Sequence, residues 1–540
     1  MKRMVALFLA ILFVLSFASC KGNDTSSSSS SISDSSADIS SGNSDVPVDG
    51  TSSVDERYTD MVARNDAALT KMYFGKVFYL PKQVTNIYLI DISEEDSDTI
   101  AMLYSLQGVV ARNHGGAIYL DNGSDASRFW VDYCSTEYGL NFDNATAGDV
   151  IKKFARYIKG AVLYSNDVPY EYTVAENLAI QSDYLVATGE TISLINPVLS
   201  NKPLLDIRKQ FSDKKSAYNY ILENCVQTSS IRYLGLMSKE SAFSDYAYAV
   251  KALILDFDFT EEWEIEMLSF IIGRPDWYQT AYVFSDRTVS TALQNVFSTN
   301  GFSIISAGDF ANCTMFSSVS AKYNTRTRKY DMEKLDSNKI YVSMYLNVES
   351  MADVQKTAYT VWNSKTSVSR ISVEYFPVLY EIAPPIAKWF KQNRTSSDML
   401  ISADLGCGSA NLSLMDPKTA ELFKNNNRYF LDACDITVMT DGADIKKADD
   451  YDEELNDLLG AEPETTITAK MRFADQDSLE SWLNTAVPVS KEPMYFLIEL
   501  QSVDFDGEAF DDLGNIISKV QRKRVGVFQF VLIENLLEYM

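Results

Sequence analysis

Short β-rich runs that alternate with helical stretches constrain the fold of this chain more than any other feature. From about residue 76 onward, runs such as AIYLD (117–121), AVLYS (161–165) and ALILDFD (252–258) are separated by stretches such as DTIAMLYSLQGVVARN. This order of strand, helix and strand predicts an α/β fold with mainly parallel sheets. The strand candidates of the second half, which include RISVEYF and MYFLIEL, predict a (β/α) barrel or a distorted relative of one.

Changes in composition predict four segments along the chain. Residues 1–19 form a signal peptide, and residues 20–56 form a disordered Ser-rich tether that lacks the apolar side chains for a core. Residues 57–245 are expected to fold as one or more α/β domains. Residues 246–540 are expected to form the (β/α) barrel-like domain.

The first twenty residues predict a lipid anchor. Lys2 and Arg3 precede a short apolar core, and the small residues Ala18 and Ser19 lead into Cys20. This arrangement resembles the lipobox of bacterial lipoproteins, which implies lipidation at Cys20 and an extracytoplasmic protein anchored to the cell membrane. The alternative is an ordinary secretory signal in which the cysteine is incidental.

The net charge, the cysteines and the single histidine argue against several classes of function. The formal net charge of −26 argues against binding to nucleic acid, because such binding relies on cations that neutralise phosphates. The remaining cysteines are scattered, which predicts neither a zinc site nor a disulfide framework, although a pair of Cys407 with Cys434 stays open. His114 is the only histidine and is expected in a turn. No metal or cofactor is predicted.

The glycine-rich stretch DLGCGS (404–409) raises the question of a nucleotide loop. Such a loop between a strand and a helix is typical of methyltransferases that use S-adenosylmethionine. Ala410 stands where a third glycine is expected, and an extracytoplasmic protein does not meet that cofactor. The stretch therefore needs another explanation.

Several segments in order resemble the GxGYxYP family of exported bacterial proteins, which is named as a glycoside hydrolase family. The segments that carry the resemblance are AMLYSLQGVVARNHGGAIYLD (101–121), NKPLLDIRKQFSDKKSAYNYILEN (201–224), KIYVSMYLNVESMADVQKTAYTVWN (339–363), RISVEYFPVLYEIAPPIAKWF (370–390) and SSDMLISADLGCGSANLSLMDP (396–417). The resemblance implies a carbohydrate as the ligand.

The motifs of that family are altered in this chain. Gly406 and Gly408 of the naming motif remain, but Ser409 replaces its first tyrosine. Residues 347–351 read NVESM where the family has an acidic SDGDN-type motif, so both aspartates are replaced. Glu349 is one position away and would point to the other face of a strand.

Candidate site residues follow from the strand ends, where barrel active sites are built. Glycosidases commonly need two carboxylates, and the candidate catalytic residues are Glu349, Glu374, Asp404 and Asp441. The candidate substrate-binding residues are Asn347, Gly406, Gly408 and Ser409. Each carboxylate can equally be a structural residue, and the glycines can merely relieve a tight turn. Tyr375, Phe376 and Trp389 could form a sugar platform, but their spacing favours core positions.

Two functions of different classes remain open. The first is a surface-anchored glycoside-hydrolase-like lipoprotein that acts on or binds a carbohydrate. The second is a noncatalytic lipoprotein that binds a glycan or another envelope component. A solute-binding lipoprotein of a transporter would share the anchor and the α/β pattern, but the family resemblance argues against it.

Overall fold

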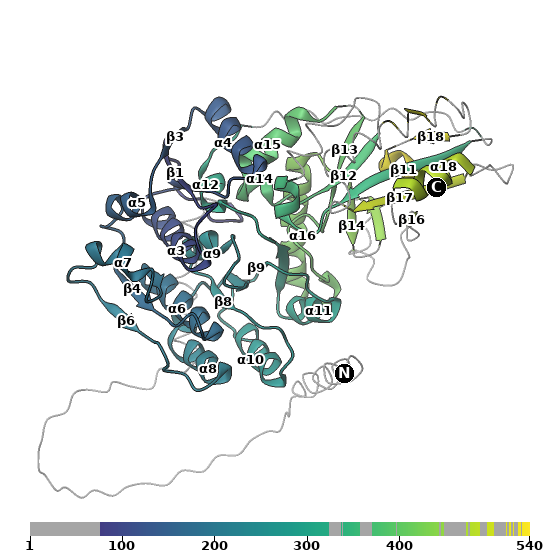
Figure 1. Cartoon of the computed structure of the whole chain (residues 1–540). Coiled ribbons are helices and arrows are strands. Elements are labelled where there is room, and N and C mark those ends of the chain that lie inside the picture. The colour runs from purple at the N-terminus through teal and green to yellow at the C-terminus, as the bar shows by residue number, and fades with distance from the viewer. Residues whose placement is uncertain are drawn as a thin grey trace, which may run out of the picture. The chain divides into compact units, whose positions relative to one another are not determined.

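The computed structural model describes residues 76–322, 336, 339–356, 370–395, 397–441, 444–447, 471–472, 476–485, 494–501, 515, 518–519, 522, 528–530 and 532–539. All of them belong to one compact unit, Leu69–Met540. Strands and helices alternate along this unit, as the colours from purple to yellow show (Figure 1). The predicted signal peptide, Cys20 and the tether lie outside the described residues and stay predictions.

Two three-stranded parallel sheets occupy the N-terminal part of the unit. The first has the order β2-β1-β3, and the second has the order β5-β4-β6. Parallel neighbours need crossover connections, which helices supply here. The strands are β1 (Asn86–Asp91), β2 (Ile118–Asp121), β3 (Asn141–Asn144), β4 (Gly160–Leu163), β5 (Tyr184–Ala187) and β6 (Leu204–Asp206).

A third parallel sheet has the order β10-β9-β7-β8. The predicted boundary between residues 245 and 246 falls between two strands of this sheet in the sequence, and that division of the chain stays a prediction. The strands are β7 (Tyr233–Leu236), β8 (Leu253–Leu255), β9 (Ala281–Ser285) and β10 (Phe302–Ser306).

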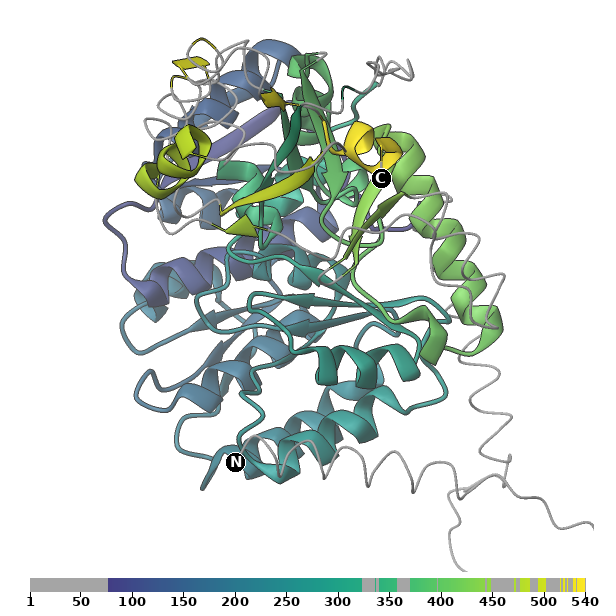
Figure 2. The same ribbon diagram turned by 90° about the vertical axis from the view of Figure 1, so that its right-hand side faces the viewer.

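The C-terminal sheet has the order β15-β14-β13-β12-β11-β17-β16, with β18 beside β11, and curls into half a barrel (Figure 2). Among the described strands of this sheet, only the pair β14 and β15 is antiparallel. The strands are β11 (Ile340–Asn347), β12 (Ile371–Tyr375), β13 (Asp398–Ser402), β14 (Val438–Asp441), β15 (Asp444–Lys447), β16 (Met471–Arg472), β17 (Met494–Gln501) and β18 (Phe528–Phe530).

Helices connect these strands throughout the described chain. Those before β11 are α3 (Ser97–Asn113), α4 (Asp125–Tyr138), α5 (Ala147–Lys153), α6 (Pro169–Ser182), α7 (Ile192–Ile195), α8 (Lys214–Asn224), α9 (Ser244–Val250), α10 (Glu262–Ile272), α11 (Thr291–Thr299) and α12 (Cys313–Ser318). Those after it are α14 (Leu379–Ile382), α15 (Pro384–Asn393), α16 (Pro417–Cys434), α18 (Gln476–Thr485) and α20 (Ile533–Tyr539). The mixed α/β fold with parallel sheets and a barrel-like C-terminal region confirms the predicted fold class.

The contacts of helix α3 explain why its LQG stretch has a glutamine and a glycine. The Asp96 side chain caps its first turn by accepting from the backbone N–H groups of Asp98 and Thr99. A Cβ atom on Gly108 would lie 2.2 Å from the Cβ of Tyr248, so glycine is what lets α3 lie this close to α9. The Gln107 side chain donates 3.1 Å to the carbonyl of Ile118, at the start of β2.

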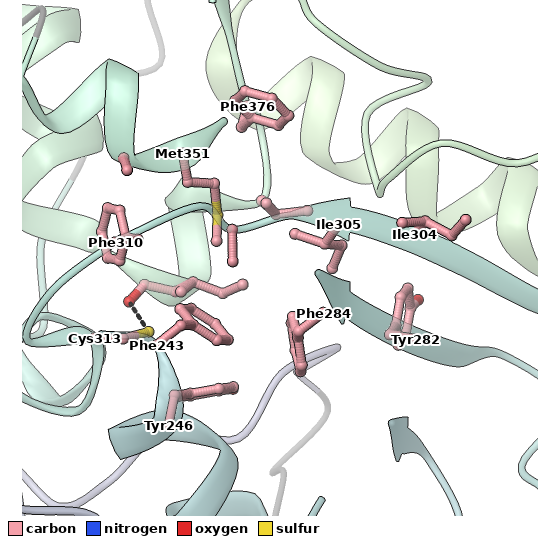
Figure 3. Close-up of a cluster of buried hydrophobic side chains, with 14 of the residues drawn as sticks. Phe243, Tyr246, Tyr282, Phe284, Ile304, Ile305, Phe310, Cys313, Met351 and Phe376 are labelled. Carbon is pink, nitrogen blue, oxygen red and sulfur yellow. Dashed lines mark hydrogen bonds between the residues drawn. The ribbon is translucent and has the colours of Figure 1, made fainter. Parts of the chain in front are cut away.

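A buried hydrophobic cluster packs the third sheet against segments of the half-barrel (Figure 3). Phe284 of β9 packs on Phe243 with 4.9 Å between ring centroids, and Ile305 of β10 is fully buried beside them. Met351 and Phe376, which follow β11 and β12, complete the cluster. The ends of strands from both sheets are therefore held close together by apolar packing, which is the main stabilising contribution to such an arrangement.

Several expectations about single residues can be judged from burial. Tyr375, Phe376 and Trp389 are buried, so they are core residues and not a sugar platform. The five cysteines of the described residues are free and buried, and the open pairing of Cys407 with Cys434 is not formed. In the part of the chain that the structure describes, no helix combines the length and apolar character needed to span a bilayer.

Candidate active site

The inner face of the half-barrel carries polar side chains near the carboxyl ends of its strands. Side chains alternate between the two faces of a strand. On β11, Met344 and Leu346 pack into the large core, whereas Tyr345 faces the opposite side. Asn347 follows two residues later and therefore shares the inner face with Tyr345.

The strand register places two glutamates on the same inner face. Glu499 of β17 is the register partner of Tyr345 of β11. Glu374 of β12 comes directly after Val373, whose register partner is Leu346, so Glu374 lies beside Asn347. Because β12 and β17 flank β11 on either side, the two carboxylates stand on strands two places apart.

These side chains open into a cleft of about 960 Å³ at the carboxyl ends of the strands. In α/β sheets, ligands bind at this end, because the loops that follow the strands converge there. Asn347, Glu349, Glu374 and Ser409, which the sequence predicts as site residues, all line the cleft. The other polar and charged residues that line it include Asp286, Arg287, Asp309, Asp353, Lys356, Thr440 and Glu499.

Glu374 is a buried carboxylate, with only 3% of its surface exposed. Its Oε2 accepts a hydrogen bond from the backbone N–H of Val348 at 3.0 Å. Hydrogen bonds to an ionised carboxylate are short and strong, so this contact fixes the orientation of the side chain toward the cleft. The sequence placed this acid within VEYFP, and the structure puts it on the inner face.

Glu499 is the second buried carboxylate, and it was not among the predicted residues. It is also 3% exposed, and the hydroxyl group of the fully buried Tyr345 donates a hydrogen bond to its Oε2. The signal that could have found it is an acid within the apolar run MYFLIEL, which is the same pattern that singled out Glu374.

Glu349 lies at the exposed rim of the cleft, just past the end of β11. Its backbone N–H donates 3.2 Å to Asp353 Oδ2, and the Ser350 hydroxyl donates 2.9 Å to the same atom. Its environment is solvent rather than apolar protein. Glu349 therefore differs from the two buried glutamates in its exposure to solvent.

The third sheet supplies the opposite wall of the cleft through loops after β9 and β10. Asp286 Oδ2 accepts from the backbone N–H and the hydroxyl of Ser238 at 2.7 and 2.8 Å, and its Oδ1 pairs with Arg287 Nε at 2.9 Å. Burial raises the pKa of Asp309, and the negative charges of Asp286, Glu240 and Asp353 raise it further. Asp286 directly follows β9 and Asp309 lies three residues after β10, and this position after a strand is the signal in the sequence that could have found them.

The glycine-rich stretch docks the half-barrel onto β10. The backbone N–H and C=O groups of Ser409 exchange hydrogen bonds with Ile304 at 2.7 and 2.9 Å. Gly408 has a φ of +92°, and a Cβ atom on it would lie 2.7 Å from the Ile304 carbonyl oxygen. Gly406 has a φ of +108°, and a Cβ atom on it would lie 2.8 Å from the carbonyl oxygen of Asn427. Both glycines thus face protein backbone, and their predicted role in binding substrate stays a prediction.

Asp404 is buried beside this loop and does not line the cleft itself. Its Oδ1 accepts from the backbone N–H of Gly406 at 2.8 Å and from the Ser402 hydroxyl at 3.3 Å. Burial raises its pKa to about 6. Asp441 ends β14, and its side chain lies outside what the structure describes.

Within the described ranges, no group of three or more His, Cys, Asp or Glu side chains is arranged to hold a metal ion. The polar side chains that line the cleft carry carboxylates, hydroxyls, amides and the cationic groups of Arg287 and Lys356.

Comparison with known proteins identifies one segment. Residues 86–156 match the family described as GxGYxYP_N 1st domain. This segment contains the strands β1 to β3 and the Gln107 and Gly108 contacts of α3, so the resemblance expected from the sequence is confirmed there. No curated protein matches the chain.

A solved structure extends the likeness of the fold beyond the GxGYxYP_N domain. The protein is from Bacteroides thetaiotaomicron VPI-5482 and is described as a "putative hydrolase". The two chains are 16% identical, the TM-score is 0.68, and the match covers 85% of this chain and 95% of the other. At this identity the likeness establishes a shared fold, and the site has to be argued from its own geometry.

Proposed function

We propose that the protein is a glycoside hydrolase that binds a carbohydrate in the acidic cleft and uses Glu374 and Glu499 as its two carboxylates. One observation carries the proposal. Two buried glutamates reach from the inner face of one half-barrel sheet into a cleft of about 960 Å³. Burying a carboxylate costs free energy, and two buried carboxylates near the ends of neighbouring strands favour a catalytic purpose.

The spacing of the strands suggests the stereochemistry. Strands two places apart are separated by on the order of 10 Å between backbones, and the register shifts Glu374 by two residues, about 7 Å, along the strands from Glu499. Inward side chains of a curled sheet converge, which shortens the distance between the carboxyl groups. Inverting glycosidases hold their carboxyl groups roughly 6.5–9.5 Å apart, which leaves room for a water molecule, whereas retaining enzymes need about 5–5.5 Å. We therefore expect hydrolysis with inversion of the anomeric configuration.

The walls of the cleft favour a neutral sugar. Asp286, Asp309, Glu349 and Asp353 surround the two glutamates, and the cations that line the cleft are Arg287 and Lys356. Carboxylates accept hydrogen bonds from sugar hydroxyls but repel an anionic ligand. A neutral oligosaccharide is the substrate class that this set of side chains suits best.

The test uses the chain from about residue 55 with a panel of neutral glycans, and measures bound glycan and new reducing ends in the same samples. Glu374→Gln and Glu499→Gln should each abolish most of the cleavage while glycan binding persists. Glu349→Gln should change cleavage only a few-fold, since Glu349 is exposed. Glu421→Gln, at an exposed position on α16, is the matched control for loss of one acid.

The noncatalytic alternative gives a different result in the same experiment. The replacement of both aspartates of the acidic motif by the residues of NVESM favours it. Glycan retention by the unaltered protein without any new reducing ends would establish a binding protein and refute the hydrolase. Unchanged cleavage in both glutamine variants would refute the assignment of the carboxylate pair.

We also propose that the protein is held outside the cytoplasm by a lipid on Cys20. The order of basic residues, apolar core and small residues before the cysteine supports this proposal. A single lipid with a long tether would leave the cleft free to reach an envelope glycan. Metabolic labelling with an alkyne-bearing fatty acid should mark the protein, and Cys20→Ala should remove the label. Equal labelling of both would refute the anchor.

A further inference from the structure

A second concave site lies at the start of the segment that matches the GxGYxYP_N family model, and it shares no lining residue with the acidic cleft. Its volume is about 700 Å³, within the roughly 300–1,000 Å³ that small-ligand sites occupy. It is formed where the start of β1, the end of α3 and the end of α5 meet. The residues that give this basic pocket its character are Lys82, Tyr88, His114, Lys153, Phe154 and Arg156.

The charge of this pocket is opposite to that of the molecule. The chain carries a formal net charge of −26, yet Lys82, Lys153 and Arg156 line the pocket and no carboxylate does. All three cations are exposed, and none lies within ion-pair distance of an acid among the described residues. The Arg156 guanidinium lies 4.5 Å from the centre of the Tyr157 ring and donates a hydrogen bond to its hydroxyl. Burial together with the positive charges of Arg156, Lys82 and Lys153 lowers the pKa of His114. The charged side chains that line the cavity are therefore all cationic, which favours an anionic ligand.

Aromatic rings line the pocket beside these cations. The Lys153 Nζ lies 6.0 Å from the centre of the Tyr88 ring, and Tyr88 meets Phe154 edge to face at 5.5 Å. The His114 ring lies 5.4 Å from that of Phe154, and its Nδ1 is 3.3 Å from the Tyr157 hydroxyl. These contacts hold the rings in place before any ligand arrives, which reduces the entropy cost of binding.

We infer that this basic pocket binds an anionic saccharide, meaning a sugar ring that carries a phosphate or carboxylate group. The cations would pair with the anionic group, and the Arg156 guanidinium can do so through two parallel hydrogen bonds. The ring of Tyr88 offers an apolar face to the sugar. Gln83, Thr85 and Asn86, which also line the pocket, supply amides and a hydroxyl for sugar hydroxyls.

The shape and polarity of the pocket argue for a discrete saccharide. A membrane surface is flat and would be met by a projecting basic face with apolar side chains. This pocket is concave, and its lining combines polar residues of the segment 82–88 with the cations of α5 and of the turn after it. The site goes beyond the proposed hydrolase activity, because none of the residues that line it lines the acidic cleft.

The only histidine of the chain lies in this pocket and makes a direct test available. In protein without a histidine tag, His114 gives the sole imidazole signal in proton–carbon NMR spectra. Glucose 6-phosphate and glucuronic acid should each shift that signal saturably and raise the pKa of His114. Glucose without the charged group should leave it in place. Inorganic phosphate should bind at least ten-fold more weakly than the sugar phosphate.

Matched variants distinguish binding in the pocket from a general effect of positive charge on the protein surface. Lys153→Ala and Arg156→Ala should each weaken binding of glucose 6-phosphate by about ten-fold. Lys152→Ala removes the same charge from the neighbouring position on α5, which is exposed but does not line the pocket, and should change binding less than two-fold. Equal effects of Lys152→Ala and Lys153→Ala would overturn the inference.

Other results would also overturn it. These are an unmoved imidazole signal with both sugar anions, equal binding of inorganic phosphate and sugar phosphate, and a response only to vesicles that contain anionic lipid. Glu374→Gln should bind glucose 6-phosphate like the unaltered protein. A failure of the hydrolase proposal and a failure of this one are thus distinguishable.

Discussion

The acidic cleft and the basic pocket are both concave and polar, but they are built in opposite ways. In the cleft, Glu374 and Glu499 are almost fully buried and each accepts a hydrogen bond from the protein. In the pocket, Lys153 and Arg156 are exposed and pair with no acid among the described residues. A buried charge that the protein orients is suited to catalysis, whereas an exposed charge next to an aromatic ring is suited to binding.

This difference shows how little the net charge says about local sites. A chain with a formal net charge of −26 still contains a pocket in which every charged lining side chain is a cation. The field within a concave site depends on the few charges around it, because water and salt screen the rest over about 8–10 Å. One molecule can therefore hold a neutral sugar at one end of its fold and an anionic one elsewhere.

The largest expected effect is on glycan cleavage in the acidic cleft. Glu374→Gln should lower glycan cleavage by roughly 10³-fold, as expected when a general acid or base is lost. Lys153→Ala should leave cleavage of the same neutral glycan within two-fold. Initial rates of reducing-end formation measure both. A comparable loss in the two variants would show that the two sites are not independent.

A pair of glycine variants tests how the cleft is held together. Gly408→Ala should lower the free energy of unfolding by about 3 kcal/mol, since the new methyl group meets the Ile304 carbonyl and φ is positive. Gly139→Ala, at the end of α4 in the domain with the basic pocket, has nothing within 4 Å and should cost only about 1 kcal/mol. Denaturant unfolding measures both, and equal costs would contradict the close docking of the loop.

The free energy of unfolding is predicted to depend on pH through Asp404. Its pKa is about 6 in the folded protein against an ordinary value of 3.8, so the folded state binds more protons than the unfolded state between these values. Stability should therefore fall by about 3 kcal/mol as the pH rises from about 4 to 6.

The comparison of two variants isolates this contribution of Asp404. Asp404→Asn should remove the extra pH dependence, whereas Asp167→Asn, at an exposed position, should retain it. Unfolding free energies at several pH values measure the difference between the two curves. Parallel curves would show that Asp404 is charged in the folded state throughout that range.

The smallest expected effect concerns salt. Raising the ionic strength from about 0.05 to 0.5 M should weaken binding of glucose 6-phosphate several-fold, because the cations of the pocket are exposed and screened. Binding of a neutral glycan in the cleft should change less than two-fold. Calorimetry on the Glu374→Gln variant measures both without turnover. Equal salt dependence of the two ligands would remove the distinction between the sites.

Much of the fold follows from local patterns in the chain. Runs such as AYVFS and FSIISA became β9 and β10, because β-branched and aromatic residues in short apolar runs fit a buried parallel sheet. Glu374 and Glu349 were both recognised as acids near strand ends. The sequence could not rank them, since only burial distinguishes them. Glu499 and Asp309 were missed because their importance depends on neighbours far away in the chain.

By itself, the sequence determined the α/β alternation, the likeness to the GxGYxYP family and the presence of a glycine-rich turn at residues 404–409. These depend on periodicity and on residue types within a few positions of one another. Only the tertiary structure decided that this turn docks on β10, that Glu374 and Glu499 share one face, and that His114 lies among cations. Strand order and register set these juxtapositions, and both arise from packing between segments that are distant in the chain.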